Sequence, residues 1–468
     1  MGTAVGRRRL ALCVLFLLPG LGISSWVTRT PAIRDALGAS TAEMGFVLFG
    51  LSIGSMIGVL GSGAVVARLG ARPVIVAGTA AMLGGLPVIG LGAGLSTALL
   101  VAFGLFLFGL GMGAGEIAMN IEGADVERVM AEPLLPRMHG FFSLGTVIGA
   151  LVGMALTAVG FPVAWHLAAM GVLTLAVAAT LFGSLPPGTG RALPRASGQG
   201  SAGGGRALWK DTRLVLIGLI VLAMALAEGT ANDWLPLIMV DGHGFAPALG
   251  SMVYAVFAAS MTVGRFAGGY FLARFGRARV LGASALAGVA GMGLVAGADS
   301  PALAAAAVVL WGLGASLGFP VALSAAGDSG PDSAARVSLV ATLGYVAFLV
   351  GPPVLGLLGE AYGLRMALVV PLLLVAFAGF LSPAARPRRA AGVRAEEDSA
   401  GAGGGGTEAE GSGAGTDRGS AETAGSGTGA DRDSAGTDRG SAETAGSGTG
   451  ADRDSAGTGQ GGAEAERA

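Results

Sequence analysis

Long apolar runs separated by short polar breaks make up most of this chain. Each run approaches or exceeds the length of about 20 residues that a helix needs to cross the hydrocarbon core of a bilayer. None shows the strict alternation that marks a membrane β-strand. The pattern therefore predicts an all-α membrane protein with twelve transmembrane helices. The expected spans cover residues 10–27, 44–66, 74–95, 98–121, 141–159, 164–185, 214–240, 251–271, 280–296, 302–326, 338–358 and 366–381.

The beginning of the chain has a second interpretation. Arg7, Arg8 and Arg9 precede an apolar run, as in a secretory signal peptide. That run is not followed by a small-x-small cleavage site. It is followed by eleven further apolar runs. A first membrane span is therefore favoured over a cleaved leader.

The polar breaks predict the orientation of the spans. If the N-terminus lies inside, the inner segments hold nearly all the arginine, and the outer segments hold only Arg29, Arg34 and Arg365. Cytoplasmic loops carry such an excess of positive charge. We therefore expect both termini to be cytoplasmic.

The amino-acid composition narrows the class of protein further. Only 13% of residues are charged, about half the proportion found in soluble domains, and 52% are hydrophobic. The net charge of −1 gives no case for nucleic acid as a partner. Cys13 is the single cysteine, which excludes an internal disulfide and a cysteine-based metal cluster. No hydrolytic or phosphotransfer motif is present, so neither an enzyme nor a cofactor is expected.

Four segments organise the chain. A Gly/Pro/Arg-rich stretch is expected to link two membrane bundles. The C-terminal tail holds a tandem duplication beginning at Thr416 and Thr437, and its small polar residues predict disorder. A neutral duplication is favoured over a functional one. The expected segments are a six-helix bundle at 1–185, a linker at 186–213, a second six-helix bundle at 214–382 and a disordered tail at 383–468.

An internal repeat relates the two bundles. Ala67–Gly70 follows the second span and Ala273–Gly276 follows the eighth, with the same Ala-Arg-x-Gly pattern. Trp26 and Trp234 stand at matching ends of the first and seventh spans. Two parallel, pseudo-symmetric halves explain matches that recur in order at nearly constant offset.

In these features the chain resembles the major facilitator superfamily. The family's loop signature after the second helix is similar to Gly63–Arg72, and a second copy lies at Gly269–Arg279. Ala67 and Ala273 stand where the family usually has aspartate, so its gating charge pair cannot be carried over. The resemblance implies a monomer whose halves rock about a central site. It also implies gating roles for Gly63, Arg68, Gly70, Arg72, Arg274 and Gly276.

More narrowly, the chain is similar to the fucose-permease neighbourhood and to YbjJ-like bacterial inner-membrane proteins. The residues that carry this resemblance lie at 25–35, 115–128, 138–145, 228–236 and 349–356. The resemblance implies an inner-membrane location, proton-coupled uptake of a sugar-like solute, and a role for Glu116 as the acid of the fourth helix. The fucose permease has a second acid in its first helix, and this chain has none there. The proton mechanism of that family therefore cannot be carried over to this chain in full.

Acids inside the spans are the main candidates for chemistry. Glu116 and Asn120 lie four residues apart and share a helix face, as do Glu228 and Asn232. Burial disfavours an ionised carboxyl, which suits such a group to bind and release a proton during transport. Asp233 points about 100° away from Asn232 and is the third candidate proton carrier. The alternative for both glutamates is a structural ion pair, for which Arg265 is a candidate partner; function is favoured for Glu116, whereas the two interpretations balance for Glu228. For Asp233, nearer the outer surface, a structural cap is an equal alternative.

Asn120 and Asn232 are candidate substrate contacts, and five further residues join them, four of which have a structural alternative. Trp26 and Trp234 could offer their rings to the C–H faces of a sugar; the alternative is that both belong to the interfacial aromatic belt. Arg29 could bind an anionic group at the outer mouth of the transport site; the alternative is a solvated loop residue. His139 could relay a proton; the alternative is a residue that packs against or caps its helix. The five further candidates are Trp26, Trp234, Arg29, His139 and Tyr345.

The sequence therefore favours proton-coupled uptake of a small polar solute by a secondary transporter. A proton-coupled exporter of a metabolite or drug is the first alternative, although the fifth span lacks the proline of the antiporter motif. A membrane receptor that has lost transport is the second. Gly351, Pro352 and Pro353 are expected to kink or break the eleventh span.

Overall fold

The computed structural model of the chain describes residues 2–130, 132, 134–191, 208–330 and 333–386. Helices fill almost all of these ranges, and no strand occurs within them. Most of the expected linker, at 192–207, and the expected tail from 387 onward lie outside the described residues.

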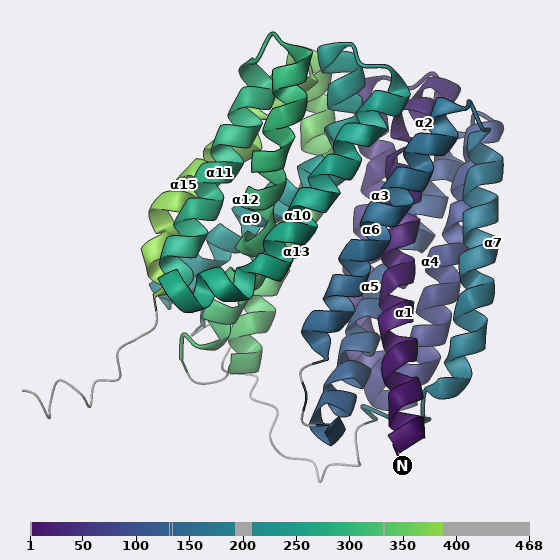
Figure 1. Cartoon of the computed structure of the whole chain (residues 1–468), viewed down its shortest axis with the longest axis vertical. Coiled ribbons are helices and arrows are strands. Elements are labelled where there is room, and N and C mark those ends of the chain that lie inside the picture. The colour runs from purple at the N-terminus through teal and green to yellow at the C-terminus, as the bar shows by residue number, and fades with distance from the viewer. Residues whose placement is uncertain (1, 131, 133, 192–207, 331–332, 387–468) are drawn as a thin grey trace, which may run out of the picture. The chain divides into compact units, whose positions relative to one another are not determined.

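The first half of the chain forms one set of helices (Figure 1). They are α1 (Gly2–Val27), α2 (Thr30–Leu37), α3 (Thr41–Leu69), α4 (Ala71–Gly94), α5 (Ala98–Met130), α6 (Leu135–Ala158) and α7 (Val163–Leu181), followed by the 3-10 turn η1 (Phe182–Ser184).

The second half forms a matching set, which runs from teal to yellow in Figure 1. It comprises α9 (Thr212–Leu237) with its π-helical end η2 (Ile238–Gly242), α10 (Pro247–Phe275), α11 (Arg277–Gly297), α12 (Pro301–Gly327), α13 (Ser333–Tyr362), α14 (Leu364–Ala367), α15 (Val369–Leu381) and the 3-10 turn η3 (Ser382–Ala385).

Twelve helical segments in the described residues are long and apolar enough to cross a membrane, which confirms the expected number of spans. The first runs over Ala4–Val27 and the last over Leu364–Ala385. Both are longer than the apolar run alone: the helix includes Arg7–Arg9 before the first run, and α14 and the 3-10 turn η3 extend the last one.

The packing inside each half confirms the pseudo-symmetry. In the first half α4 packs on α5, α3 on α5 and α1 on α6. The corresponding pairs in the second half, α11 with α12, α10 with α12 and α9 with α13, are also in extensive contact. Gly70 and Gly276, at the matching ends of α3 and α10, have φ of 90° and 75°. Each turn therefore needs the conformational freedom of glycine.

The eleventh span is expected to kink or break at its prolines; it does not break, because α13 continues through Pro352 and Pro353. A proline leaves the carbonyl four residues earlier without its helical donor. For Pro352 that carbonyl belongs to Phe348, and the Ser52 hydroxyl of α3 donates to it at 2.7 Å. A side chain from the other half thus satisfies the group that the proline frees.

The halves meet along two lines, α3 against α13 and α6 against α10. We call the end of the molecule that holds the start of α1 the near end, and the end that holds Val27 the far end. At the far end, the Ser251 hydroxyl donates to the Thr28 carbonyl at 2.9 Å, and Glu360 accepts from the Thr41 amide at 2.9 Å. Between described residues, the hydrogen bonds that join the halves run from this end to the contact between Ser143 and Arg265.

Candidate functional site

An ion pair in the second half reaches across to the first. Arg265 of α10 donates through Nη2 to Glu228 Oε1 of α9 at 2.9 Å. Its Nη1 donates to the Ser143 hydroxyl of α6 at 3.2 Å. The side chains of Arg265 and Glu228 are 25% and 14% exposed, so the pair is largely but not fully removed from solvent. The arginine therefore connects α9 to the opposite half.

Glu116 approaches this pair from the first half. Its side chain is half-buried, and it is close enough to Arg265 and Glu228 to interact electrostatically with both. It has no hydrogen bond or ion pair with any described residue. Arg265 pairs with Glu228, so the expected structural pair between Glu116 and Arg265 is not formed. Glu116 is an acid inside a span without a direct partner.

The two asparagines differ in how their amides are satisfied. Asn232 Oδ1 accepts a hydrogen bond from the Tyr254 hydroxyl at 3.2 Å. Asn120 Oδ1 is buried and has no partner among the described residues. Each asparagine is half-buried, like the glutamate four residues before it. Asn120 is therefore the amide available to a ligand.

His139 and Tyr345 join the same region. His139 is exposed, packs edge-to-face on Phe16 with ring centres 5.1 Å apart, and lies within electrostatic range of Arg265. Tyr345 is half-buried and interacts electrostatically with Glu116. We call the resulting group the seam cluster. Its members are Glu116, His139, Ser143, Glu228, Arg265 and Tyr345.

Asp233 stands apart from the seam cluster. It is 7% exposed and has no hydrogen bond or ion pair with any described residue. It interacts electrostatically with Tyr254. The neighbouring Asn232 shares that tyrosine, so Asp233 remains adjacent to the candidate site.

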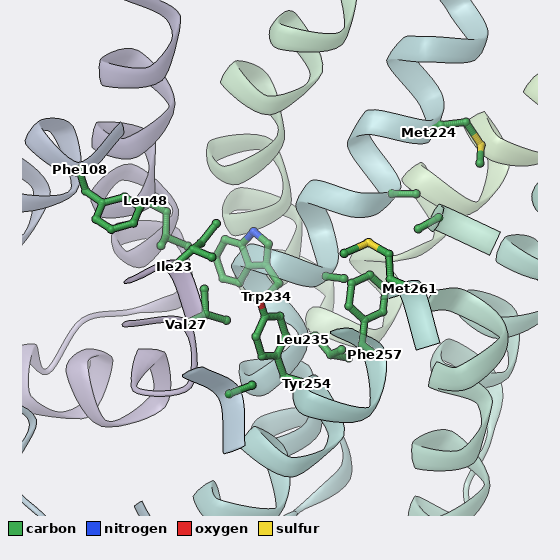
Figure 2. Packing of buried hydrophobic residues seen from close by; sticks show 14 of the residues in the cluster. Ile23, Val27, Leu48, Phe108, Met224, Trp234, Leu235, Tyr254, Phe257 and Met261 are labelled. Carbon is green, nitrogen blue, oxygen red and sulfur yellow. The ribbon is translucent and has the colours of Figure 1, made fainter. Parts of the chain in front are cut away.

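The tryptophans lie in the packed interior. Trp26 and Trp234 are each 1% exposed, which rules out the interfacial aromatic belt for both. In Figure 2, Trp234 lies against Ile23, Val27 and Leu48 of the first half. Both indole N–H groups are buried without an acceptor among the described residues. By contrast, Trp311 donates to the Ala227 carbonyl at 3.2 Å.

Arg29 is buried, contrary to a solvated loop position, with 3% exposure. Its Nε donates to His166 Nδ1 at 3.0 Å. Burial lowers the pKa of the Arg29 guanidinium to about 10, so it is charged at neutral pH. His166, a lone histidine within an apolar run, is not among the residues that the sequence analysis predicted for a site.

The expected gating residues gather at the near end, where α3 joins α4 and α10 joins α11. Arg68 and Arg274 are exposed, Arg72 is half-buried, and none has an ion pair with a described residue. Arg277, which sequence reasoning missed, pairs with Asp328 at 2.6 Å. Gly63 lies in the last turns of α3, with no atom near the place of a side chain. The gating roles stay predictions.

The described residues contain no group of three or more His, Cys, Asp or Glu side chains that could hold a metal ion.

Comparison with known proteins assigns the family. The family model for the Major Facilitator Superfamily matches residues 10–338 and 274–412. An uncharacterized MFS-type transporter of Yersinia pestis is 30% identical over 365 residues, covering 78% of this chain and 92% of the relative. The chain belongs to the major facilitator superfamily.

Solved structures agree with the fold. The nucleoside transporter NupG matches with a TM-score of 0.61 and 19% identity, over 81% of this chain and 98% of that one. The E. coli fucose:proton symporter FucP matches with a TM-score of 0.59 and 18% identity, over 81% and 98%. The chain is thus a multi-pass membrane protein and a transporter rather than an enzyme.

Proposed function

We propose that this protein is a secondary active transporter that couples proton movement to the uptake of a small polar solute, such as a sugar or sugar derivative. The observation that carries the proposal is the state of Glu116. It is an acid inside a span, without a direct partner, within electrostatic range of an ion pair in the opposite half.

Protonation of Glu116 would change the forces on Arg265. In this structure Arg265 is held by Glu228, and a neutral Glu116 would not compete with that pair. When Glu116 is ionised, its charge draws the same guanidinium toward the first half, in competition with Glu228. Because Arg265 also bonds Ser143 across the seam, its position biases how the halves pack. Proton loading is thereby linked to the rocking of the halves.

Neutral polar groups around the cluster suit a hydroxylated solute. Asn120 has a free amide oxygen, and Asn232, His139 and Tyr345 supply further donors and acceptors. A few convergent polar groups in an otherwise apolar site fix the orientation of such ligands. The fold neighbours named above act on a nucleoside and on fucose, which supports a sugar-like moiety. Asp233 is proposed as a second proton carrier.

From the positive-inside pattern we infer that the near end and both termini face the cytoplasm, and we propose the inner membrane of a bacterium as the location. The contacts that join the halves at the far end would then close the outer side. We propose an inward-facing monomer with one six-helix bundle at 1–185 and a second at 214–382; most of the expected linker and tail lie outside the described residues.

The test uses purified protein in proteoliposomes and a panel of labelled sugars and nucleosides. With an inward proton gradient, we expect accumulation of at least one solute. Glu116→Gln should abolish gradient-driven accumulation while preserving solute exchange without a gradient. The matched control is Glu122→Gln on the same helix, since Glu122 is paired with Arg8. Per folded molecule, that variant should accumulate solute normally.

Three outcomes would count against the proposal. Accumulation by Glu116→Gln equal to that of the wild type would remove Glu116 from coupling. Accumulation only when the gradient is reversed would indicate the exporter. Binding without flux in either direction would indicate a receptor.

A further inference from the structure

A cavity of about 470 Å³ lies at the far end, away from the seam cluster. Its walls come from both halves of the chain. Arg29 and the connection between α6 and α7 form one side, and the start of α10 forms the other. No acidic side chain is among the described residues that line it.

The arginine in this wall is not neutralised. Arg29 is 3% exposed, yet its one side-chain hydrogen bond goes to His166 and not to a carboxylate. Because a guanidinium can only donate, His166 Nδ1 must accept, which leaves a neutral imidazole with its proton on Nε2. Arg29 Nη2 and His166 Nε2 are both buried without a partner among the described residues. A buried charge of this kind is costly unless something pairs with it.

Two helix starts add positive potential to the same cavity. α7 begins after Pro162 and α10 begins after Ala246, and neither has a side-chain cap. Val163 and Ala248, in the first turns of these helices, line the cavity. The unpaired amides at a helix N-terminus favour an anion.

We propose that this cavity binds an oxyanion, a carboxylate or phosphate group, which pairs with Arg29 and with the first turns of α7 and α10. The planar guanidinium matches two oxygens of such a group, and the volume admits a small organic acid or phosphate. Since Arg29 belongs to the first half and α10 to the second, a bound anion holds the far end closed. The inference does not rest on the proposed transport function.

The experiment measures thermal unfolding of the full chain in a neutral detergent. Potassium phosphate or sodium acetate is titrated at constant ionic strength, and a separate arm adds phosphatidylglycerol or phosphatidylcholine in mixed micelles. We expect a saturable rise in Tm with an oxyanion, because ligand that binds only the folded state stabilises it. Arg29→Gln should lose the rise. Arg34→Gln should retain it, because Arg34 is already paired with Asp35 and Asp241.

A second variant covers the case in which Arg29→Gln does not fold. Ala248→Asp places a fixed carboxylate at the cavity wall, and it should abolish the response to added anion. Leu249→Asp adds the same charge to the same helical turn on an exposed residue outside the lining, and it should keep the response.

The arms also identify the source of the anion. A response to phosphate or acetate that depends on Arg29 indicates a soluble ligand, and one to phosphatidylglycerol alone indicates a lipid headgroup. No saturable response in the wild type, or equal responses in the wild type and in Ala248→Asp, would overturn the site.

Discussion

One buried carboxylate at the near end depends on a single arginine. Glu122 is fully buried, and its Oε1 accepts from Arg8 Nε at 2.6 Å. Arg8 also pairs with Asp125 at 2.8 Å, whereas Glu122 Oε2 has no partner among the described residues. This contact fixes α1 to α5 and therefore supports the helix that carries Glu116.

We expect Arg8→Gln to lower the stability of the protein by about 3 kcal/mol, because it leaves the Glu122 charge buried and unpaired. Unfolding in mixed detergent micelles would measure the loss. The neighbouring Arg9 provides the control: it lies 3.8 Å from Glu132, and both side chains are about half exposed. Arg9→Gln should cost less than about 1 kcal/mol. Equal losses in the two variants would contradict this account.

At the residue scale, the sequence predicted which charged residues lie inside the spans, but it did not predict which of them pair with one another. Glu116, Glu228 and Arg265 stood out because charges inside apolar runs are costly. The acid with which Arg265 pairs depends on the relative rotation of α5, α9 and α10. This rotation cannot be predicted from the periodicity of the sequence. Arg29 looked like a loop residue, since its burial comes from segments far along the chain.

Glycine determines how closely the helices of each half approach. A Cβ at Gly109 of α5 would overlap the carbonyl oxygen of Leu51 on α3, and one at Gly54 would overlap that of Phe106. The backbones of α3 and α5 are therefore in direct contact, as small residues permit in membranes. Gly61 of α3, by contrast, has nothing within 4 Å of a Cβ.

We expect Gly109→Ala to destabilise the first half by about 1–3 kcal/mol, because the two helices must move apart. Gly61→Ala, on the open face of α3, should be neutral or stabilising by up to about 1 kcal/mol, since alanine favours the helix. Thermal unfolding of both variants would test the pair. Destabilisation by Gly61→Ala as large as that by Gly109→Ala would show that helix contact is not the cause.

At the element scale, the number and type of helices could be predicted because a membrane span needs length and apolar character, both of which are visible in the sequence. The continuity of α13 could not. It depends on Ser52, which lies 296 positions earlier in the chain and donates to the carbonyl that Pro352 leaves free. The local rule about proline allows a kink or a break, and the distant hydroxyl helps to explain why the break does not occur.

For the whole molecule, the energetic question is what holds the far end closed. Besides the apolar packing around Trp234, polar contacts join the halves there. Glu360 accepts from the amides of Thr41 and Ala42, at 2.9 and 3.3 Å, and so caps α3 from the opposite half. Arg34 pairs with Asp241 across the same boundary. Each contact must break when the far end opens.

The pair between Arg34 and Asp241 gives a direct test of this arrangement, because its removal destabilises only the closed form. The side chains are 18% and 31% exposed, so the pair contributes about 0.2–1 kcal/mol. Asp241→Asn should therefore raise the population open at the far end about 1.5- to 5-fold. Distances between spin labels at Ala36 and Ala302, exposed positions at the far end of each half, would report it once Cys13 is replaced.

The matched control for that measurement is Asp299→Asn, which removes the same charge at the same end. Asp299 is fully exposed and lies 3.9 Å from Arg365 within the second half. Its contact should therefore be the same whether the far end is open or closed, and its removal should not shift the balance between the two forms. Its distance distribution should match that of the wild type. If Asp241→Asn also left the distribution unchanged, the closed far end would be held by the packing of α3 on α13 and of Trp234 on the first half, and the surface charges would have no part in gating.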